Sequence, residues 1–320
     1  RAMPRSPRTA PLPLTLQRRQ WMRWTLGSLA AAGAALGLAP RNAQARPMPT
    51  LVEAVQLPAW VERHGQRRPA QPGIALRAGD KALTAAAARL LLRMPDRSQI
   101  KLGEATELLI EAMNMQPLGV AQPQQVQTSL RLATGVFRYA TDVASKLAGH
   151  QRQLQLKLAT ATVGIRGTDF WSMSDAKHDA VCVFDGRVAV QREGRPDIAL
   201  NQPGAFWVTF TGQPEKPAGQ ATPEQLAKFI ATADLTPGSG VLVQGGSWRT
   251  VVATFPRLAE AEALRMRLQK AGYPASVANT VRGHEVRVQQ VATRQDAEAL
   301  LRKLQADPTL GAAQGRVEGA

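Results

Sequence analysis

Residues 161–170 read Ala161-Thr-Val-Gly-Ile-Arg166-Gly167-Thr168-Asp169-Phe170, and this stretch decides the fold of the region around it. A glycine between an alternating strand and a bulky aromatic residue predicts a tight bend or a close approach of the backbone. We expect Thr168 to form a local hydrogen bond at this bend and Phe170 to return to the core. The motif is therefore predicted to be structural, with contact of Arg166 to a partner as the alternative.

Short runs of alternating apolar and polar residues flank this stretch on both sides. The clearest pairs are Leu90/Leu92, Ile100/Leu102, Leu108/Ile110, Val181/Val183 and Val188/Val190. Runs of this length, separated by Gly, Pro and Asp, are typical of all-β domains. Asp185-Gly186 lies between two runs and predicts a two-residue hairpin, because a type I′ turn needs positive φ at both central positions. We therefore predict a mainly β domain of stacked short strands over residues 46–210.

Length and composition limit the protein classes to consider. The 320 residues are 44% hydrophobic and 20% charged, as in an ordinary globular protein of about two domains. A single cysteine, Cys182, excludes an intramolecular disulfide and a cysteine-clustered zinc site, and the four scattered histidines have no metal-ligand spacing. The net charge of +16 favours anionic partners without indicating nucleic acid.

The first 45 residues hold seven arginines and no lysine, aspartate or glutamate. Arg18-Arg19 precedes an apolar run over residues 24–38, and Ala43-Gln-Ala45 follows it. This order is that of an export signal, and paired arginines before a weakly hydrophobic run resemble a twin-arginine signal. We expect cleavage after Ala45 and a mature protein in the periplasm. A retained segment that anchors the protein to the membrane and a disordered basic tail are the alternatives.

A Pro- and Gly-rich segment at residues 211–240 is predicted to be a linker. Thr222-Pro-Glu-Gln225 within it is a capping box with proline in the first helical turn, and it predicts a short helix that continues to Ala233.

The C-terminal part contains an internal repeat with an offset of 36 residues. Ala261-Glu-Ala-Leu264 recurs as Ala297-Glu-Ala-Leu300. The same offset relates two pairs of predicted strands, which are 250–255 with 286–291 and 276–281 with 312–317. Each half is predicted to be strand, helix, strand, so residues 241–320 should form a ferredoxin-like βαββαβ unit. We expect Gly272 to end the first helix, and Thr293 with Asp296 to begin the second.

Five short motifs of the β-rich region occur in an order that is found in a known family. They are Leu76-Arg-Ala-Gly-Asp-Lys-Ala-Leu-Thr84, Met94-Pro-Asp-Arg-Ser98, Leu132-Ala-Thr-Gly-Val-Phe-Arg138, residues 161–170 with Val183-Phe-Asp-Gly-Arg-Val188, and Leu200-Asn-Gln-Pro-Gly204. Together they resemble the FecR domain, the extracytoplasmic module of iron-dicitrate-type signalling proteins. The resemblance implies a sensor or scaffold that contacts another envelope protein. The Pro- and Arg-rich residues before the apolar run do not resemble that family's sigma-factor-binding module.

The C-terminal repeat, with Phe255, Ala271-Gly-Tyr-Pro274 and Val286-Arg-Val288, is similar to the SPOR domain. This resemblance implies binding to peptidoglycan glycan strands, favouring those without stem peptides. The open sheet face is expected to present Trp248, Arg287, Gln289 and Gln290, as far as strand alternation allows. For Trp248, packing at the start of a hairpin is the alternative.

The sequence contains no Gly-x-Ser-x-Gly, phosphate-loop or His-Glu-x-x-His pattern, so we expect neither an enzyme nor a cofactor. RNA binding is not expected either, because residues 286–291 have no aromatic side chain for stacking on bases. The prediction is an exported, non-enzymatic envelope protein that binds peptidoglycan and acts as a sensor or scaffold. The alternative is a FecR-type signalling regulator that binds an envelope protein and has no glycan affinity.

Overall fold

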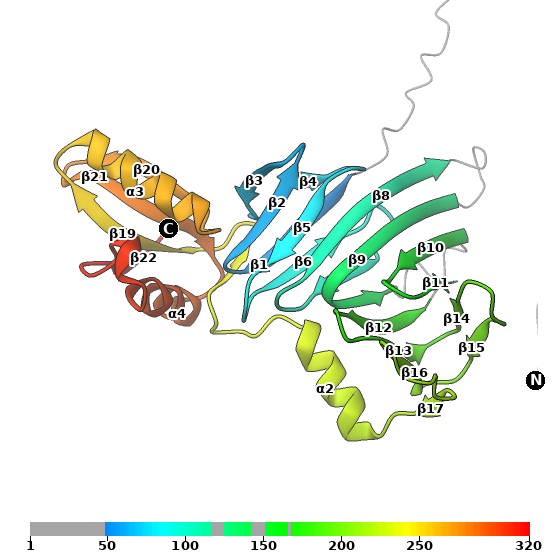
Figure 1. Ribbon diagram of the computed structural model, residues 1–320. Helices are drawn as coiled ribbons and strands as arrows, with labels where there is room; N and C mark the ends of the chain where they lie inside the picture. Colours follow the sequence, from blue (N-terminus) through cyan, green and yellow to red (C-terminus); the bar gives the residue numbers. More distant parts are fainter. Residues whose placement is uncertain (1–48, 117–124, 142–150, 166–167) are drawn as a thin grey trace, which may run out of the picture. The chain divides into compact units, whose positions relative to one another are not determined.

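Two β-sheets that share one buried core make up the N-terminal part of the protein (Figure 1). The computed structural model describes residues 49–116, 125–141, 151–165 and 168–320. The ten apolar residues of the alternating runs are all buried, and the predicted mainly β class is confirmed. Strand alternation places these side chains between the sheets, where their burial drives the packing.

The first sheet has the strand order β1-β6-β7-β9-β12-β13-β16-β17, with β4 beside the start of β1. Its strands are β1 (Thr50–Gln56), β4 (Ala75–Leu76), β6 (Arg89–Arg93), β7 (Gln99–Leu102), β9 (Gln125–Ala140), β12 (Asp169–Ser174), β13 (His178–Asp185), β16 (Ala205–Phe210) and β17 (Gly219–Gln220).

The second sheet has the order β3-β2-β5-β8-β9-β10-β11-β14-β15. Its further strands are β2 (Ala59–Arg63), β3 (Gln66–Pro69), β5 (Lys81–Thr84), β8 (Glu107–Gln116), β10 (Gln151–Lys157), β11 (Thr162–Ile165), β14 (Val188–Gln191) and β15 (Ile198–Leu200).

Strand β9 belongs to both sheets and changes from one to the other at Gly135. This glycine has φ +99°, and a Cβ atom there would lie 2.3 Å from Thr106 Oγ1. The same oxygen accepts the backbone N–H of Val136 at 3.0 Å. The crossing therefore needs a residue without a side chain.

The predicted hairpin at Asp185-Gly186 is wrong. Strand β13 pairs with β12 and β16 in the first sheet, whereas β14 pairs with β11 and β15 in the second. Only Gly186 of the two residues has positive φ, at +86°. The turn carries the chain between sheets, so it does not need the two left-handed residues of a type I′ hairpin.

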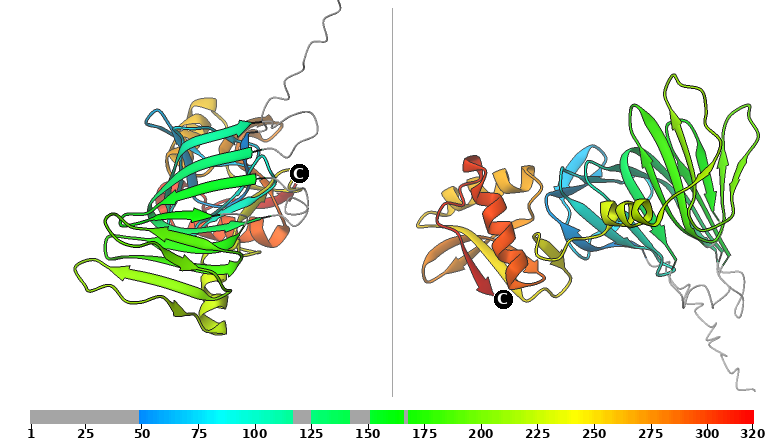
Figure 2. Two further views of the ribbon diagram at one scale, coloured as in Figure 1. Left: turned by 90° about the vertical axis from the view of Figure 1, so that its right-hand side faces the viewer. Right: turned by 90° about the horizontal axis from the view of Figure 1, so that it is seen from below.

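The segment predicted to be a linker packs on the outer face of the first sheet through α2 (Pro223–Ala233; Figure 2). The capping box at Thr222 is confirmed, with both of its hydrogen bonds present. Phe229 stacks on Trp171 with ring centroids 4.2 Å apart, and Trp171 Nε1 donates to Thr232 Oγ1 at 3.0 Å. The helix thus covers aromatic side chains that the sheet would otherwise expose.

The C-terminal part is a four-stranded antiparallel sheet in the order β22-β19-β21-β20. Its elements follow as β19 (Trp248–Phe255), α3 (Leu258–Lys270), β20 (Ala275–Thr280), β21 (Gly283–Val291), α4 (Arg294–Gln305), the 3₁₀ helix η1 (Pro308–Leu310) and β22 (Arg316–Gly319). The helices keep the predicted offset of 36 residues. The last strand begins at Arg316 rather than at residue 312, because η1 occupies the chain after α4.

Strand β18 (Val241–Val243) joins the two parts of the compact unit formed by residues 46–320. It pairs with β1 through Ala54, Val55 and Gln56, and with β21 through the pair Leu242–Val291. Two longer side chains reinforce the junction, as Trp60 Nε1 donates to Lys270 O at 3.3 Å and Lys303 Nζ donates to Leu57 O at 2.7 Å. One core cluster extends across both parts.

Candidate functional site

The outer face of the C-terminal sheet, opposite the helices, carries two of the predicted site residues. Val286 and Val288 on β21 are fully buried in the core that includes α3 and α4. Because side chains alternate along a strand, Arg287 and Gln289 belong to the opposite face. Arg287 lies beside Val251 of β19 and Ser276 of β20.

Arg287 differs from the other arginines on this face. It is half-buried, and within the described ranges no carboxylate lies at ion-pairing distance from it. Its Nε atom is buried without a hydrogen-bond partner among the described residues. A buried donor without a partner is costly, and because this atom is buried, a ligand would have to bind the terminal Nη groups of Arg287.

The neighbouring charges on β22 already have partners. Arg316 Nη2 lies 2.5 Å from the buried Glu285, and its Nε lies 2.7 Å from Glu318. Glu318 also pairs with Arg249 at 3.0 Å and with Arg282 at 3.2 Å. The hydrogen bond from Arg316 and the other two arginines lower the pKa of Glu318 to about 2, against the opposing effect of burial. These charges are therefore paired with one another, and Arg287 is the cation of this face that has no carboxylate partner among the described residues.

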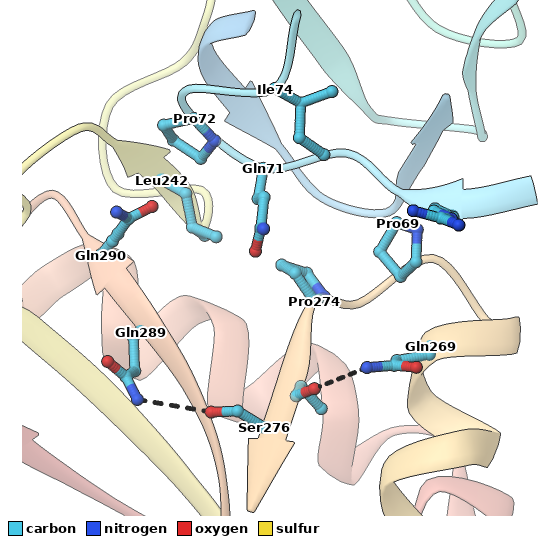
Figure 3. Close-up of a pocket in the computed structure, with 12 residues that line it drawn as sticks. Pro69, Gln71, Pro72, Ile74, Leu242, Gln269, Pro274, Ser276, Gln289 and Gln290 are labelled. Atoms are coloured by element: carbon cyan, nitrogen blue, oxygen red, sulfur yellow. Dashed lines mark hydrogen bonds between the residues drawn. The ribbon is translucent and has the colours of Figure 1, made fainter. Parts of the chain in front are cut away.

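Gln289 and Gln290 lie at the end of the face where β21 bulges. Both residues stand opposite Arg249, and Gln290 has φ +61°. Gln289 is exposed and donates from Nε2 to Ser276 Oγ at 3.3 Å. Gly246 permits the bulge, because a Cβ atom there would lie 2.3 Å from Gln290 O. Bulges redirect side chains, and here both amides line a cavity of about 700 Å³ (Figure 3).

The structure does not bring Trp248 together with Arg287 and Gln289. Trp248 lies two residues before Thr250, which is buried and donates to Ala297 O of α4 at 3.1 Å. Alternation therefore points Trp248 toward the helix side of the sheet, where it packs partly buried against the core.

The motif around Thr168 belongs to the core in its described part. Thr168 is buried and donates from Oγ1 to Arg187 O at 3.0 Å. Phe170 is fully buried and packs against Phe137 at 5.6 Å between ring centroids. Arg166 and Gly167 lie outside the described residues, so their predicted roles remain predictions.

An ion-pair cluster that was not predicted from the sequence lies behind this motif. Arg138 on β9 pairs with Asp169 at 2.9 Å and with Asp234, the C-cap of α2, at 3.3 Å. Lys101 binds the same Asp234 at 2.7 Å. Arg138 and Asp169 both lie in quoted motifs, but only the register between β9 and β12 shows that they meet.

The predicted export signal lies outside the residues that the structure describes. Arg18, Arg19, Ala43 and Ala45 lie outside them. Over the described ranges, no helix is long and apolar enough to cross a membrane, and no group of three or more His, Cys, Asp or Glu is placed to hold a metal ion. Cys182 is a buried free thiol whose pKa is raised to about 12 by burial, so it is not a reactive group.

The solved structures that are similar to this chain include two crystal structures of a "putative anti-sigma factor" from Parabacteroides distasonis, at 2.50 and 1.65 Å resolution. The similarity is weak, with 13% sequence identity and TM-scores of 0.36 and 0.35. It covers 71% of this chain and 90% of the other chain in each case. No curated protein sequence matches the chain.

Two family models match separate parts of the sequence. The model described as FecR protein matches residues 80–189, and the model described as SPOR domain matches residues 244–310. Both are binding or regulatory domains without catalytic activity, and SPOR domains bind peptidoglycan and occur in cell-envelope proteins. The two parts of the structure thus carry the two families that the motifs and the repeat indicated: the chain combines a FecR domain with a SPOR domain.

Proposed function

We propose that this is an exported, non-enzymatic envelope protein that binds peptidoglycan through its SPOR domain and acts as a sensor or scaffold through its FecR domain. The proposal includes a twin-arginine signal over residues 1–45, a periplasmic location, and domains at 46–210 and 241–320 joined by residues 211–240. It also assigns the SPOR domain a ferredoxin-like layout, which the strand order β22-β19-β21-β20 supports.

The observation that carries glycan binding is the unpaired Arg287 beside the exposed amide of Gln289. Peptidoglycan strands alternate N-acetylglucosamine with N-acetylmuramic acid, whose lactyl group ends in a carboxylate when the stem peptide is absent. A guanidinium group recognises a carboxylate with paired hydrogen bonds, and an amide can both donate to and accept from sugar hydroxyls. The surface therefore matches peptide-free glycan strands.

A sacculus pull-down with the full exported chain tests this proposal. Wild type should be retained at 0.1 M and at 1 M salt, since hydrogen bonds persist when the Debye length falls from about 10 Å to about 3 Å. Arg287→Ala and Gln289→Ala should each weaken retention, whereas Arg294→Ala should not, because Arg294 is an exposed arginine on α4. Retention that disappears at 1 M salt would reduce binding to charge attraction, and no retention at either salt would refute the proposal.

The second candidate function is a signalling regulator whose FecR domain binds another envelope protein. The match to the FecR family over residues 80–189 favours it. Periplasmic crosslinking in cells separates the two candidates. A regulator without glycan affinity would crosslink to one protein and leave sacculi unbound.

A further inference from the structure

A groove lies between β3, at the edge of the second N-terminal sheet, and β20, at the edge of the C-terminal sheet (Figure 3). Its volume is about 700 Å³, within the range of roughly 300–1,000 Å³ that is usual for ligand sites. One wall is formed by β3 and the turn after it, with Arg68, Pro69 and Gln71. The other wall is formed by the end of α3, the start of β20 and the bulge of β21.

The two walls are held in a fixed relation by backbone pairing. The β1–β18 ladder and the Leu242–Val291 pair connect one sheet to the other directly below the groove, and Leu242 itself forms part of the lining. Ala59 N–H donates to Gly272 O at 3.4 Å behind the wall. A ligand would thus enter a preformed site and would not have to order it.

The lining is rich in neutral amides. It contains Gln71, Gln269, Gln289 and Gln290 together with Ser276, one cation at Arg68 and no carboxylate. Gln289 and Gln269 are oriented by their hydrogen bonds to Ser276 Oγ and Ala275 O. The amides of Gln71 and Gln290 have no hydrogen-bond partner among the described residues, and Figure 3 shows Gln71 pointing into the groove.

The apolar side chains in the lining complete a surface suited to sugars. Pro72, Ile74, Leu242 and Pro274 offer C–H surface between the amides. Amides that donate and accept match hydroxyl and acetamido groups, which also do both. A peptide strand added to the edge of β20 fits less well, because Gln269 Nε2 already occupies the Ala275 carbonyl at 2.9 Å.

We propose that this groove binds the glycan strand beside the sheet face, so that Gln71, from the chain segment before the FecR match, is part of the peptidoglycan site. The inference rests on the proposed function and extends it. Gln289 connects the two surfaces, since it lines the groove and belongs to the face of Arg287. The SPOR domain would then recognise glycan only as half of a composite site, with β3 as the other wall.

Binding of soluble, peptide-free glycan strands to the full exported chain tests the composite site. Gln71→Ala should raise the dissociation constant about three- to tenfold, as expected for one or two lost hydrogen bonds. Gln290→Gly should raise it by a similar factor. This variant also relieves the left-handed φ, so its loss of binding would not come from unfolding. Gln314→Ala, an exposed glutamine outside the lining, should bind like wild type.

The two levels of the proposal fail in different ways. If wild type binds and Arg287→Ala weakens binding while Gln71→Ala and Gln290→Gly bind like wild type, the groove is overturned and the proposed function stands. If wild type binds neither sacculi nor soluble strands, the proposed function fails and the groove inference fails with it.

Discussion

The two halves of the C-terminal repeat have nearly the same core but different ends. The first half is β19-α3-β20 and the second is β21-α4-β22. Equivalent helix positions, 36 residues apart, are fully buried in both halves: Ala261 and Ala297, Leu264 and Leu300, Leu268 and Leu304. The shared pattern therefore specifies how each helix packs on the sheet.

The helix starts differ, because the start of α4 binds backbone groups that precede the repeat, whereas the start of α3 has no side-chain cap. In α4, Thr293 Oγ1 accepts the N–H of Asp296 at 3.1 Å, and Asp296 Oδ1 accepts the N–H groups of Gly240 and Val241. In α3, the N-cap Arg257 forms no side-chain capping bond. The second helix thus fixes the strand that leads into the domain, which the first does not.

The helix ends differ for a similar reason. After α3, Gly272 has φ +89°, Tyr273 N–H bonds to Leu268 O, and Gly272 N–H bonds to Gln269 O, which is the Schellman arrangement. This turn lies against Trp60 of β2. After α4, Ala306 remains right-handed and the chain continues into η1. Contacts outside the repeat therefore determine where its symmetry breaks.

The largest expected effect is at the end of α3. In Gly272→Ala, the new Cβ would lie 2.7 Å from the Trp60 ring and 2.9 Å from Pro58 Cβ, in addition to the cost of the left-handed φ. We expect a loss of about 3 kcal/mol in the free energy of unfolding, measured by urea denaturation. Gly245→Ala is the matched control, since it has φ +75° and open space around it, and should cost only about 1 kcal/mol. Equal losses would show that Trp60 does not restrict this turn.

The next effect concerns the start of α4. Asp296→Ala removes the acceptor of two buried N–H groups, at 3.2 and 3.1 Å, and should cost about 2 kcal/mol. Its repeat equivalent, Glu260→Ala, removes an exposed ion pair with Arg257 and should cost less than about 0.5 kcal/mol. Thermal or urea unfolding of the two variants checks the difference. A cost at residue 260 as large as that at residue 296 would contradict the asymmetry.

Features with a local cause were predictable from the sequence. The two helices, the Thr222 capping box, the Thr293 cap and the glycine stop after α3 depend on residues within one or two turns. The buried strand positions follow from period-2 alternation. This pattern predicts which side chains are buried even when the partners of the strand are unknown. The position of Gln289 on an outer face followed from the same rule.

Features that depend on distant pairing were not predictable. Asp185-Gly186 has the composition of a hairpin, yet its flanking strands find partners in different sheets. The ladder between β1 and β18, the Arg138–Asp169 pair and the place of Gln71 beside β20 all join residues far apart in the chain. For Trp248 the sequence left both the open face and packing against the core as alternatives, because the start of β19, and hence its alternation, was not fixed by the pattern.

A smaller effect distinguishes the two bulges of the β19–β21 pair. The bulge of β21 contains Gln290, which has φ +61°. The extra residue in the bulge of β19 is Val252, which is buried and does not have a positive φ. Gln290→Gly should therefore stabilise the protein by about 0.5–1 kcal/mol, because glycine adopts this conformation without strain. Gln289→Gly should destabilise it by a similar amount, since this residue is not left-handed. A higher melting temperature for the first variant and a lower one for the second would confirm the bulge; the reverse order would refute it.

The smallest effect is a pH dependence to which, of the two closing strands of the repeat, only β22 should contribute. Strand β20 has no ionisable side chain, whereas β22 carries Arg316 and Glu318. The folded pKa of Glu318 is about 2, below the ordinary value of 4.5, chiefly through the hydrogen bond from Arg316. A depressed folded pKa means that this carboxylate stabilises the fold above about pH 4.5 and that the contribution is lost as pH falls toward 2.

Because the pair is partly solvated, Glu318→Gln should cost less than about 0.5 kcal/mol at neutral pH, and its unfolding free energy should fall less steeply than that of wild type between pH 4.5 and pH 2. Glu111 on β8, with a pKa also near 2, continues to titrate in the variant, so the slope should shrink without vanishing. Urea unfolding across this range, with Glu298→Gln on α4 as the control, measures the change. An unchanged slope in Glu318→Gln would show that the network on β22 contributes nothing to the acid stability of the sheet.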